Sequence, residues 1–301
     1  MKNLTKKPKL TAFFGFTAII AVIALALTAC DTGGGRGDPC DSGHTFTQWK
    51  VTTVATCTED GEETQECSVC GTLGTVTQPI AALGHDHTES LVCIRTGCDH
   101  QYALGGTGPA GGKIFYIAPD GFTVEGYTGT TGTFAQYTAH YLEVAPANAA
   151  NSKWRGSATA NVLIPASTGI TTRDSFDALQ LTDSIGKGRR DTQIIVAFYA
   201  DTAQSTNATA VTDTAANRAS DYTTTFDSVT YNDWFLPSLG ELNLLYGNKN
   251  EVGMESVTST FWSSSQFSGG GGSAWYQDFA NSDRLGSNKN YTDAVRAVRA
   301  F

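Results

Sequence analysis

The end of the chain reads Phe261-Trp-Ser-Ser-Ser-Gln266, then a stretch rich in Gly, Ser, Asn, Tyr and Asp, then Ala294-Val-Arg-Ala-Val-Arg-Ala-Phe301. Aromatic and β-branched residues concentrate in the two outer segments, which is typical of buried strands. The polar centre is typical of a surface that varies freely while a rigid scaffold holds it. The pattern therefore predicts a scaffold with a variable surface, and it favours a binding protein over an enzyme.

Within the polar centre, Trp275-Tyr-Gln-Asp-Phe-Ala280 alternates with period two. A strand would place Trp275, Gln277 and Phe279 on one face and the three intervening residues on the other. We expect the first face to be fixed and the second to be open to change. The candidate ligand-binding residues are Phe267, Ser268, Tyr276, Asp278, Ala280, Asn281, Ser282, Asp283, Arg284, Leu285, Ser287, Tyr291 and Asp293. Tyr, Ser, Gly and Asn are also the residues that antibody binding loops use.

Residues 1–29 have the pattern of an export signal, with four lysines before an uncharged apolar run at 10–27. The run is followed by Leu27-Thr-Ala-Cys30, which resembles a bacterial lipobox and implies cleavage before Cys30 and lipid attachment there. A transmembrane helix is the alternative, because about 18 apolar residues nearly span a bilayer. We expect residues 30–38 to be a lipidated Gly-rich tether on the bacterial cell envelope, at the surface of the outer membrane.

The charge of the chain excludes one class of partner. Removing residues 1–29 removes four lysines and no acidic residue, so the formal net charge moves from -9 to -13. A chain this acidic has no electrostatic footprint for nucleic acid. Anionic lipid surfaces would also repel it, so the lipid on Cys30 is the expected membrane attachment. We expect a monomer.

Residues 39–103 form a compositional unit of their own. Six of the seven cysteines lie in this unit, between positions 40 and 98, and the unit also contains the histidines at 44, 85, 87 and 100. About sixty residues with few large apolar side chains cannot bury a sufficient core, so covalent or metal staples are expected. We predict a small Cys/His-rich β domain here.

Two kinds of staple remain open for this unit. An exported chain could join its cysteines in disulfides. Against that, Cys67-Ser-Val-Cys70 has the spacing of a zinc knuckle, and thiolate and imidazole are ligands that zinc prefers. We predict Cys40, Cys57, Cys67 and Cys70 as zinc ligands or disulfide partners. The unit is similar to a short repeat of bacterial surface proteins, with motifs at 40–44, 55–61, 67–71 and 83–85, and we interpret it as a spacer.

Residues 104–301 are long enough for one sizeable core and contain no cysteine. Short apolar runs separated by Gly-rich and Asn-rich loops predict an α+β domain. Ser238 and Glu241 form a capping box, which marks the start of a helix. The expected strands are 113–118, ending at Pro119-Asp-Gly121, then 141–145, 261–267, 275–279 and 294–301; the expected helices are 192–200, 203–222 and 238–246.

A set of motifs runs in order through this domain: Gly111-Gly-Lys-Ile-Phe-Tyr116, Tyr141-Leu-Glu-Val-Ala145, Ile185-Gly-Lys-Gly188, Asp233-Trp-Phe-Leu-Pro-Ser238, Glu241-Leu-Asn-Leu-Leu-Tyr246, Phe261-Trp-Ser-Ser-Ser265 and Val298-Arg-Ala-Phe301. They resemble the Lcl C-terminal domain family, and the tail is most similar to lipoproteins of the Treponema variable protein A type. The resemblance implies a C-type-lectin-like fold, related to formylglycine-generating enzymes. It also implies a variable region at about 262–301 that a diversity-generating retroelement rewrites.

These features predict a surface-displayed lipoprotein that binds a protein or glycan through its C-terminal face. The alternative is an adhesin or glycosaminoglycan-binding lectin of fixed specificity. An enzyme of the formylglycine-generating fold would need cysteines in this domain, and none follows Cys98. We expect no catalytic residue and no cofactor here: His140 is expected to be an ordinary surface residue, and Glu241 a helix cap. Asp201, Asp213, Asp221 and Asp227 are scattered without calcium-loop spacing. We interpret Trp234, Trp262 and Trp275 as core residues.

Overall fold

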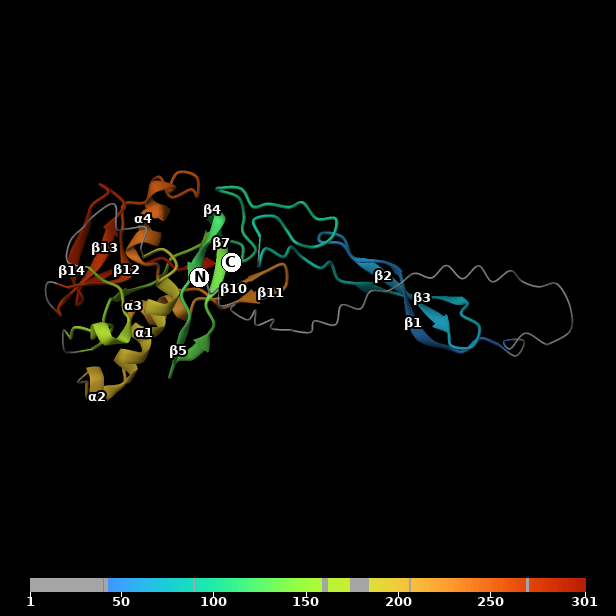
Figure 1. Ribbon diagram of the computed structural model, residues 1–301, viewed down its shortest axis with the longest axis horizontal. Helices are drawn as coiled ribbons and strands as arrows, with labels where there is room; N and C mark the ends of the chain where they lie inside the picture. The colour runs from blue at the N-terminus through green and yellow to red at the C-terminus, as the bar shows by residue number, and fades with distance from the viewer. Residues whose placement is uncertain are drawn as a thin grey trace, which may run out of the picture.

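The computed structural model describes residues 40, 43–88, 90–158, 162–173, 184–205, 207–268 and 271–301. Residues 1–39, and with them Cys30 and the predicted signal and tether, lie outside this set. Within it the chain is a mixed α and β protein, mostly sheet, with four α-helices. The first sheet lies apart from the larger body formed by the rest of these residues (Figure 1).

The small module, residues 39–103, contains one antiparallel sheet in the order β1-β2-β3. Its strands are β1 (Phe46–Thr53), β2 (Gly61–Cys67) and β3 (Leu73–Ile80). No side chain of β1 or β3 is buried. Among the described residues of the module, the buried apolar side chains are Cys40, Ala55, Cys67 and Cys93. Since three of these are cysteines, burial of hydrocarbon contributes little to holding this sheet together.

The large domain, residues 104–301, begins with a three-stranded sheet in the order β16-β7-β4. Its strands are β4 (Lys113–Val124), β7 (Tyr137–Val144) and β16 (Val298–Ala300). The strand predicted at 113–118 is present, but its predicted end was wrong. It continues past Pro119-Asp-Gly121 because a register irregularity between Ile117 and Phe122 absorbs the extra residues.

The second sheet of the large domain has the order β14-β13-β12-β15-β8, and β9 also pairs with β12. Its strands are β8 (Ala149–Lys153), β9 (Thr172–Arg173), β12 (Thr260–Phe267), β13 (Ser273–Asp278), β14 (Arg284–Asn288) and β15 (Thr292–Val295). The strands predicted at 261–267 and 275–279 are confirmed.

The prediction of one strand over 294–301 was wrong. The segment divides into β15, which pairs with β12 and β8, and β16, which pairs with β7 of the other sheet. The chain crosses from one sheet to the other between Val295 and Val298, and Ala297 is buried at the crossing. The tail therefore joins the two sheets.

The α-helices are α1 (Gly188–Ala200), α2 (Thr202–Ser205), α3 (Ala215–Ser220) and α4 (Leu239–Gly247). Ser238 is the N-cap of helix α4, and both hydrogen bonds of the predicted capping box are present. Helix α1 is confirmed and begins four residues earlier than predicted. The single helix predicted over 203–222 was wrong, since this stretch holds the end of α2 and the separate helix α3, which begins with its own capping box at Thr214.

Three short elements complete the described part of the domain. Two hairpins, β5 (Tyr127–Gly129) with β6 (Gly132–Phe134) and β10 (Thr224–Phe226) with β11 (Val229–Tyr231), and the 3-10 turn Ala166–Thr168 lie outside the two main sheets.

Two hydrophobic clusters hold the large domain together. One contains Trp154, Trp234 and Trp262 and receives apolar side chains from α1 and α3. The other contains Phe115 and Phe261 and receives side chains from α4. Trp275 packs with Leu239 and Phe267 in a third, small cluster. The prediction that Trp234, Trp262 and Trp275 are core residues is confirmed, because all three are almost fully buried.

Candidate functional site

The predicted alternation in β13 is confirmed. Trp275, Gln277 and Phe279 are buried, whereas Tyr276 and Asp278 are half-buried and Ala280 is exposed. Every candidate ligand-binding residue is half-buried or exposed. We use the name display face for this set: Phe267, Ser268, Tyr276, Asp278, Ala280, Asn281, Ser282, Asp283, Arg284, Leu285, Ser287, Tyr291 and Asp293. Two members lie on the other side of the sheet from Tyr276, because Phe267 packs on Trp275 and Arg284 lies opposite Gln277.

Strand β13 positions the centre of the display face between two partner strands. Tyr276 lies opposite Trp262 of β12 and opposite Leu285 of β14. The rings of Trp262 and Tyr276 meet edge to face, so a buried tryptophan supports the tyrosine from below. Leu285 and Tyr291 are 51% and 63% exposed, so both side chains are accessible to a partner.

The turn from Asp278 to Asp283 is fixed by its own hydrogen bonds. The Asp278 carboxylate accepts the Ala280 N–H at 2.7 Å, and the Asn281 side-chain oxygen accepts the Asp283 N–H at 3.0 Å. Gln277 donates to the Ser282 carbonyl at 3.1 Å. Asp278 and Asn281 therefore shape the turn as well as facing solvent, a double role that the sequence pattern did not reveal.

A buried lysine anchors the loop after β14. Lys289 Nζ donates to the Gln266 side-chain oxygen at 2.7 Å and to the Val162 carbonyl at 3.0 Å, and it lies 4.4 Å from the Trp154 ring centroid. Burial lowers the pKa of Lys289 to about 7. Sequence reasoning missed this residue; its signal is a lone lysine inside a Gly-, Ser- and Asn-rich stretch.

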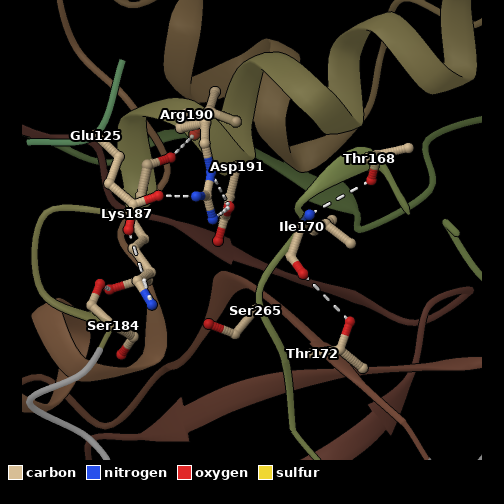
Figure 2. A network of polar contacts seen from close by, with 12 residues as sticks. Glu125, Thr168, Ile170, Thr172, Ser184, Lys187, Arg190, Asp191 and Ser265 are labelled. Carbon is tan, nitrogen blue, oxygen red and sulfur yellow. Dashed lines mark hydrogen bonds and ion pairs between the residues drawn. The ribbon is translucent and has the colours of Figure 1, made fainter. Parts of the chain in front are cut away.

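Polar residues at the start of α1 form a network that links this helix to the segment after β4 (Figure 2). Arg190 pairs with Glu125 and with Asp191, the latter at 2.9 Å. The Lys187 N–H donates to the Ser184 carbonyl at 3.1 Å. Burial raises the pKa of Asp191 despite the neighbouring guanidinium. The network ties α1 to the segment after β4.

Two residues singled out in the large domain, Glu241 and His140, have structural partners. Glu241 accepts the N–H groups of Ser238 at 2.7 Å and Gly186 at 2.8 Å, so its predicted role as a helix cap is confirmed. The prediction that His140 is a surface residue was wrong. It is buried, and its Nδ1 lies 3.0 Å from the Ala118 carbonyl of the neighbouring strand β4.

The cysteines and histidines of the small module gather in two groups. The first metal-ligand group is Cys40, His44, Cys67 and Cys70, and the second is Cys57, His85, Cys93 and Cys98. Within each group the four ligand atoms lie within 4.8 Å of one another, so each group could hold a metal ion.

The spacing inside the groups fits a tetrahedral ion. The sulfur atoms of Cys40 and Cys67 are 3.6 Å apart, and those of Cys57 and Cys93 are 3.7 Å apart. A disulfide needs about 2.05 Å, whereas sulfurs bound to one tetrahedral zinc at about 2.3 Å are separated by about 3.8 Å. No disulfide joins the described cysteines, and the spacing in both groups is compatible with a bound metal ion.

Backbone N–H groups lower the pKa of two of the thiols, Cys67 and Cys93. The N–H groups of Cys70 and Val69 lower the pKa of the Cys67 thiol to about 5. Burial opposes the same effect at Cys93, but the Asp86 N–H, 3.3 Å from its sulfur, helps to lower its pKa to about 6. Hydrogen bonds with Cys70 and Cys98 instead raise the pKa of the Cys40 and Cys57 thiols to about 12. Metal binding would therefore release protons from these two thiols, because the thiolate is the form that binds metal.

The predicted ligand set mixed members of both groups. The structure brings Cys40, Cys67 and Cys70 together but places Cys57 in the second group. Cys57 precedes β2 and Cys67 ends it, and a seven-residue strand separates its ends by about 20 Å. Sequence reasoning missed His44, His85, Cys93 and Cys98 as ligands; the enrichment of histidine near cysteine was the signal for them.

Comparison with known proteins did not identify a relative, since no family model and no curated protein matches the chain. Within the described residues, no helix is both long enough and apolar enough to cross a bilayer.

Proposed function

We propose that this chain is a surface-displayed lipoprotein whose large domain binds a protein or glycan through the display face. The observation that carries the proposal is β13, in which Trp275 and Gln277 are buried whereas Tyr276 and Asp278 are half-buried. Buried Trp275, Gln277 and Phe279 hold the strand while neighbouring positions reach solvent. Residues on such a surface can change without altering the core.

We further propose a C-type-lectin-like scaffold, rewritten at about 262–301 by a retroelement and anchored through lipid on Cys30. Support for the scaffold comes from the tail, which joins the two sheets, and from the motifs of the resemblance. Support for variation comes from the surface position of all the display-face residues.

Binding fits the large domain better than catalysis. Its buried acids are engaged in bonds that hold the fold. Glu143 accepts the N–H groups of Gly112 at 2.7 Å and Ala110 at 3.1 Å, and it lies 3.4 Å from Arg299. Arg299 in turn makes a two-pronged pair with Asp233. These contacts give each group a structural role.

For the small module we propose Zn²⁺ in both metal-ligand groups and a spacer role. Three sulfurs and one imidazole nitrogen make a closed structural site of the kind that zinc occupies. Metal analysis of the full chain, purified without reductant, tests this. We expect two zinc ions per chain and no disulfide; disulfides without zinc would contradict the proposal.

Sequencing the gene from independent isolates tests the proposed variation of the display face. We expect substitutions at display-face positions and none at Trp275, Gln277 or Phe279, which serve as the internal control. A near-copy of the codons for 262–301 should lie beside a reverse transcriptase gene. An invariant display face without such a copy would contradict a diversified binder and favour an adhesin or glycosaminoglycan-binding lectin of fixed specificity.

A further inference from the structure

The second metal-ligand group lies at the start of a continuous series of ring contacts that reaches the large domain. His85 contributes its Nδ1 to this group, 3.2 Å from the Cys98 sulfur. The same imidazole stacks on His100, with ring centroids 3.7 Å apart and planes 8° from parallel. A metal held by His85 would therefore also fix the position of His100.

His100 passes this constraint to two further rings of the small module. Its Nδ1 lies 3.2 Å from Nε2 of His87, and its ring meets Tyr102 edge to face at 4.6 Å. His87 is buried, with its Nδ1 3.1 Å from the Leu91 carbonyl. The segment around these residues thus folds back on the second metal-ligand group.

The large domain completes the series. Tyr141 of β7 donates its hydroxyl to the Leu91 carbonyl at 2.6 Å. Tyr102 meets the rings of Tyr141 and Phe301 edge to face, each at 5.4 Å. Tyr141 and Phe301 stack on each other and share backbone hydrogen bonds across the first sheet of the large domain. Tyr141 is fully buried in this arrangement.

The first metal-ligand group has a different setting. Its His44 packs on Phe46 of β1, with ring centroids 5.6 Å apart, and Cys67 is the last residue of β2. A metal in this group would order the three-stranded sheet itself.

We propose that a metal ion in the second metal-ligand group clamps the small module onto the large domain through His85, His100 and Tyr102. The metal in the first group serves the local sheet only. The proposal rests on the zinc binding proposed above. In this proposal the second site helps to set the orientation of the large domain, and so of its display face, relative to the small module.

Two matched ligand variants of the full chain in detergent, Cys98→Ser and Cys70→Ser, separate the two sites. Metal analysis counts the ions, and hydroxyl-radical footprinting measures the exposure of Tyr141. We expect each variant to lose one of two ions. Only Cys98→Ser should increase the hydroxyl-radical modification of Tyr141, and the increase should be several-fold. The same variant should show a larger radius of gyration in small-angle scattering.

A third variant, Tyr102→Ala, removes the bridging ring and leaves every metal ligand in place. We expect it to keep two ions and, like Cys98→Ser, to increase the exposure of Tyr141. Should Cys98→Ser fail to fold, removing and restoring Zn²⁺ in the Cys70→Ser chain makes the same comparison on the second site alone.

The outcomes distinguish the clamp from the metal itself. Loss of one ion in Cys98→Ser with Tyr141 still protected would overturn the clamp and leave the zinc proposal intact. Equal exposure of Tyr141 in Cys98→Ser and Cys70→Ser would also overturn the clamp. A wild-type chain without bound metal would overturn the zinc proposal and the clamp together.

Discussion

The small module and the large domain are held together by different means. The module buries almost no hydrocarbon and concentrates its cysteines and histidines in two metal-ligand groups. The large domain has no cysteine and relies on apolar clusters that contain Trp154, Trp262 and Phe261. The stability of the first should therefore depend on metal, and that of the second on packing and on the protonation of buried groups.

Removing the metal with a chelator should have the largest effect on stability, and it should affect the small module but not the large domain. Structural zinc supplies about 10–16 kcal/mol in small metal-dependent folds, so removing it should unfold the sheet β1-β2-β3. The large domain should keep its cooperative unfolding transition. Hydrogen exchange measured peptide by peptide checks this.

Adding back Zn²⁺ should restore protection in that sheet, and Mg²⁺ should not, since it prefers oxygen ligands. If the sheet stayed folded after complete metal removal, the small module would not depend on metal for its stability.

Trp262→Ala should have the next largest effect, and only on the large domain. The ring is fully buried and its Nε1 donates to the Ser152 carbonyl at 3.0 Å. Removing such a side chain costs about 3–5 kcal/mol. Urea unfolding followed by tryptophan fluorescence measures the loss, and the metal content should stay unchanged. Trp262→Phe, which keeps an aromatic ring, should cost less; equal costs would argue against packing as the cause.

Glu241 should make the stability of the large domain depend on pH to a smaller extent. Burial raises the pKa of Glu241 from 4.5 to about 7. Between these values the folded chain holds a proton that the unfolded chain has lost. The contribution is therefore fully present below pH 4.5 and is lost as the pH rises through about 7.

Urea unfolding at several pH values from 4 to 8 measures this loss. Glu241→Gln carries no titrating proton and should lack this part of the slope. Parallel pH profiles for the two chains would show that the carboxyl group titrates normally.

Substitutions on the display face should have the smallest effect on stability. Tyr291→Ala and Leu285→Ser change largely exposed side chains, so each should alter the free energy of unfolding by no more than about 0.5 kcal/mol. Asp278→Ala is the informative contrast, because it also removes the bond to the Ala280 N–H. A large cost at Tyr291 would mean that the face belongs to the scaffold.

Local patterns were the part of the structure that the sequence could predict. The capping box at Ser238 and the period-two alternation from Trp275 to Phe279 depend on residues close in the chain, and both are confirmed. The spacing of Cys67 and Cys70 likewise pointed to one half of a metal-ligand group.

Pairing between residues far apart in the chain could not be predicted from the sequence. Cys57 shares a group with Cys98, and nothing near either residue specifies the other. The division of the tail into β15 and β16 depends on which strands lie beside it in space. The burial of Lys289 depends on Gln266 and on the carbonyl of Val162, which lie far from it in sequence.

The position of β16 at the end of the tail has a genetic consequence. Val298 and Ala300 pair with β7, and they are encoded downstream of every display-face residue. A frameshift anywhere between codons 267 and 293 would replace this strand and leave the first sheet of the large domain without its edge. If residues 262–301 are rewritten as proposed, changes that preserve the reading frame keep it. Under that proposal, only versions translated in frame through the variable stretch would complete the first sheet of the large domain.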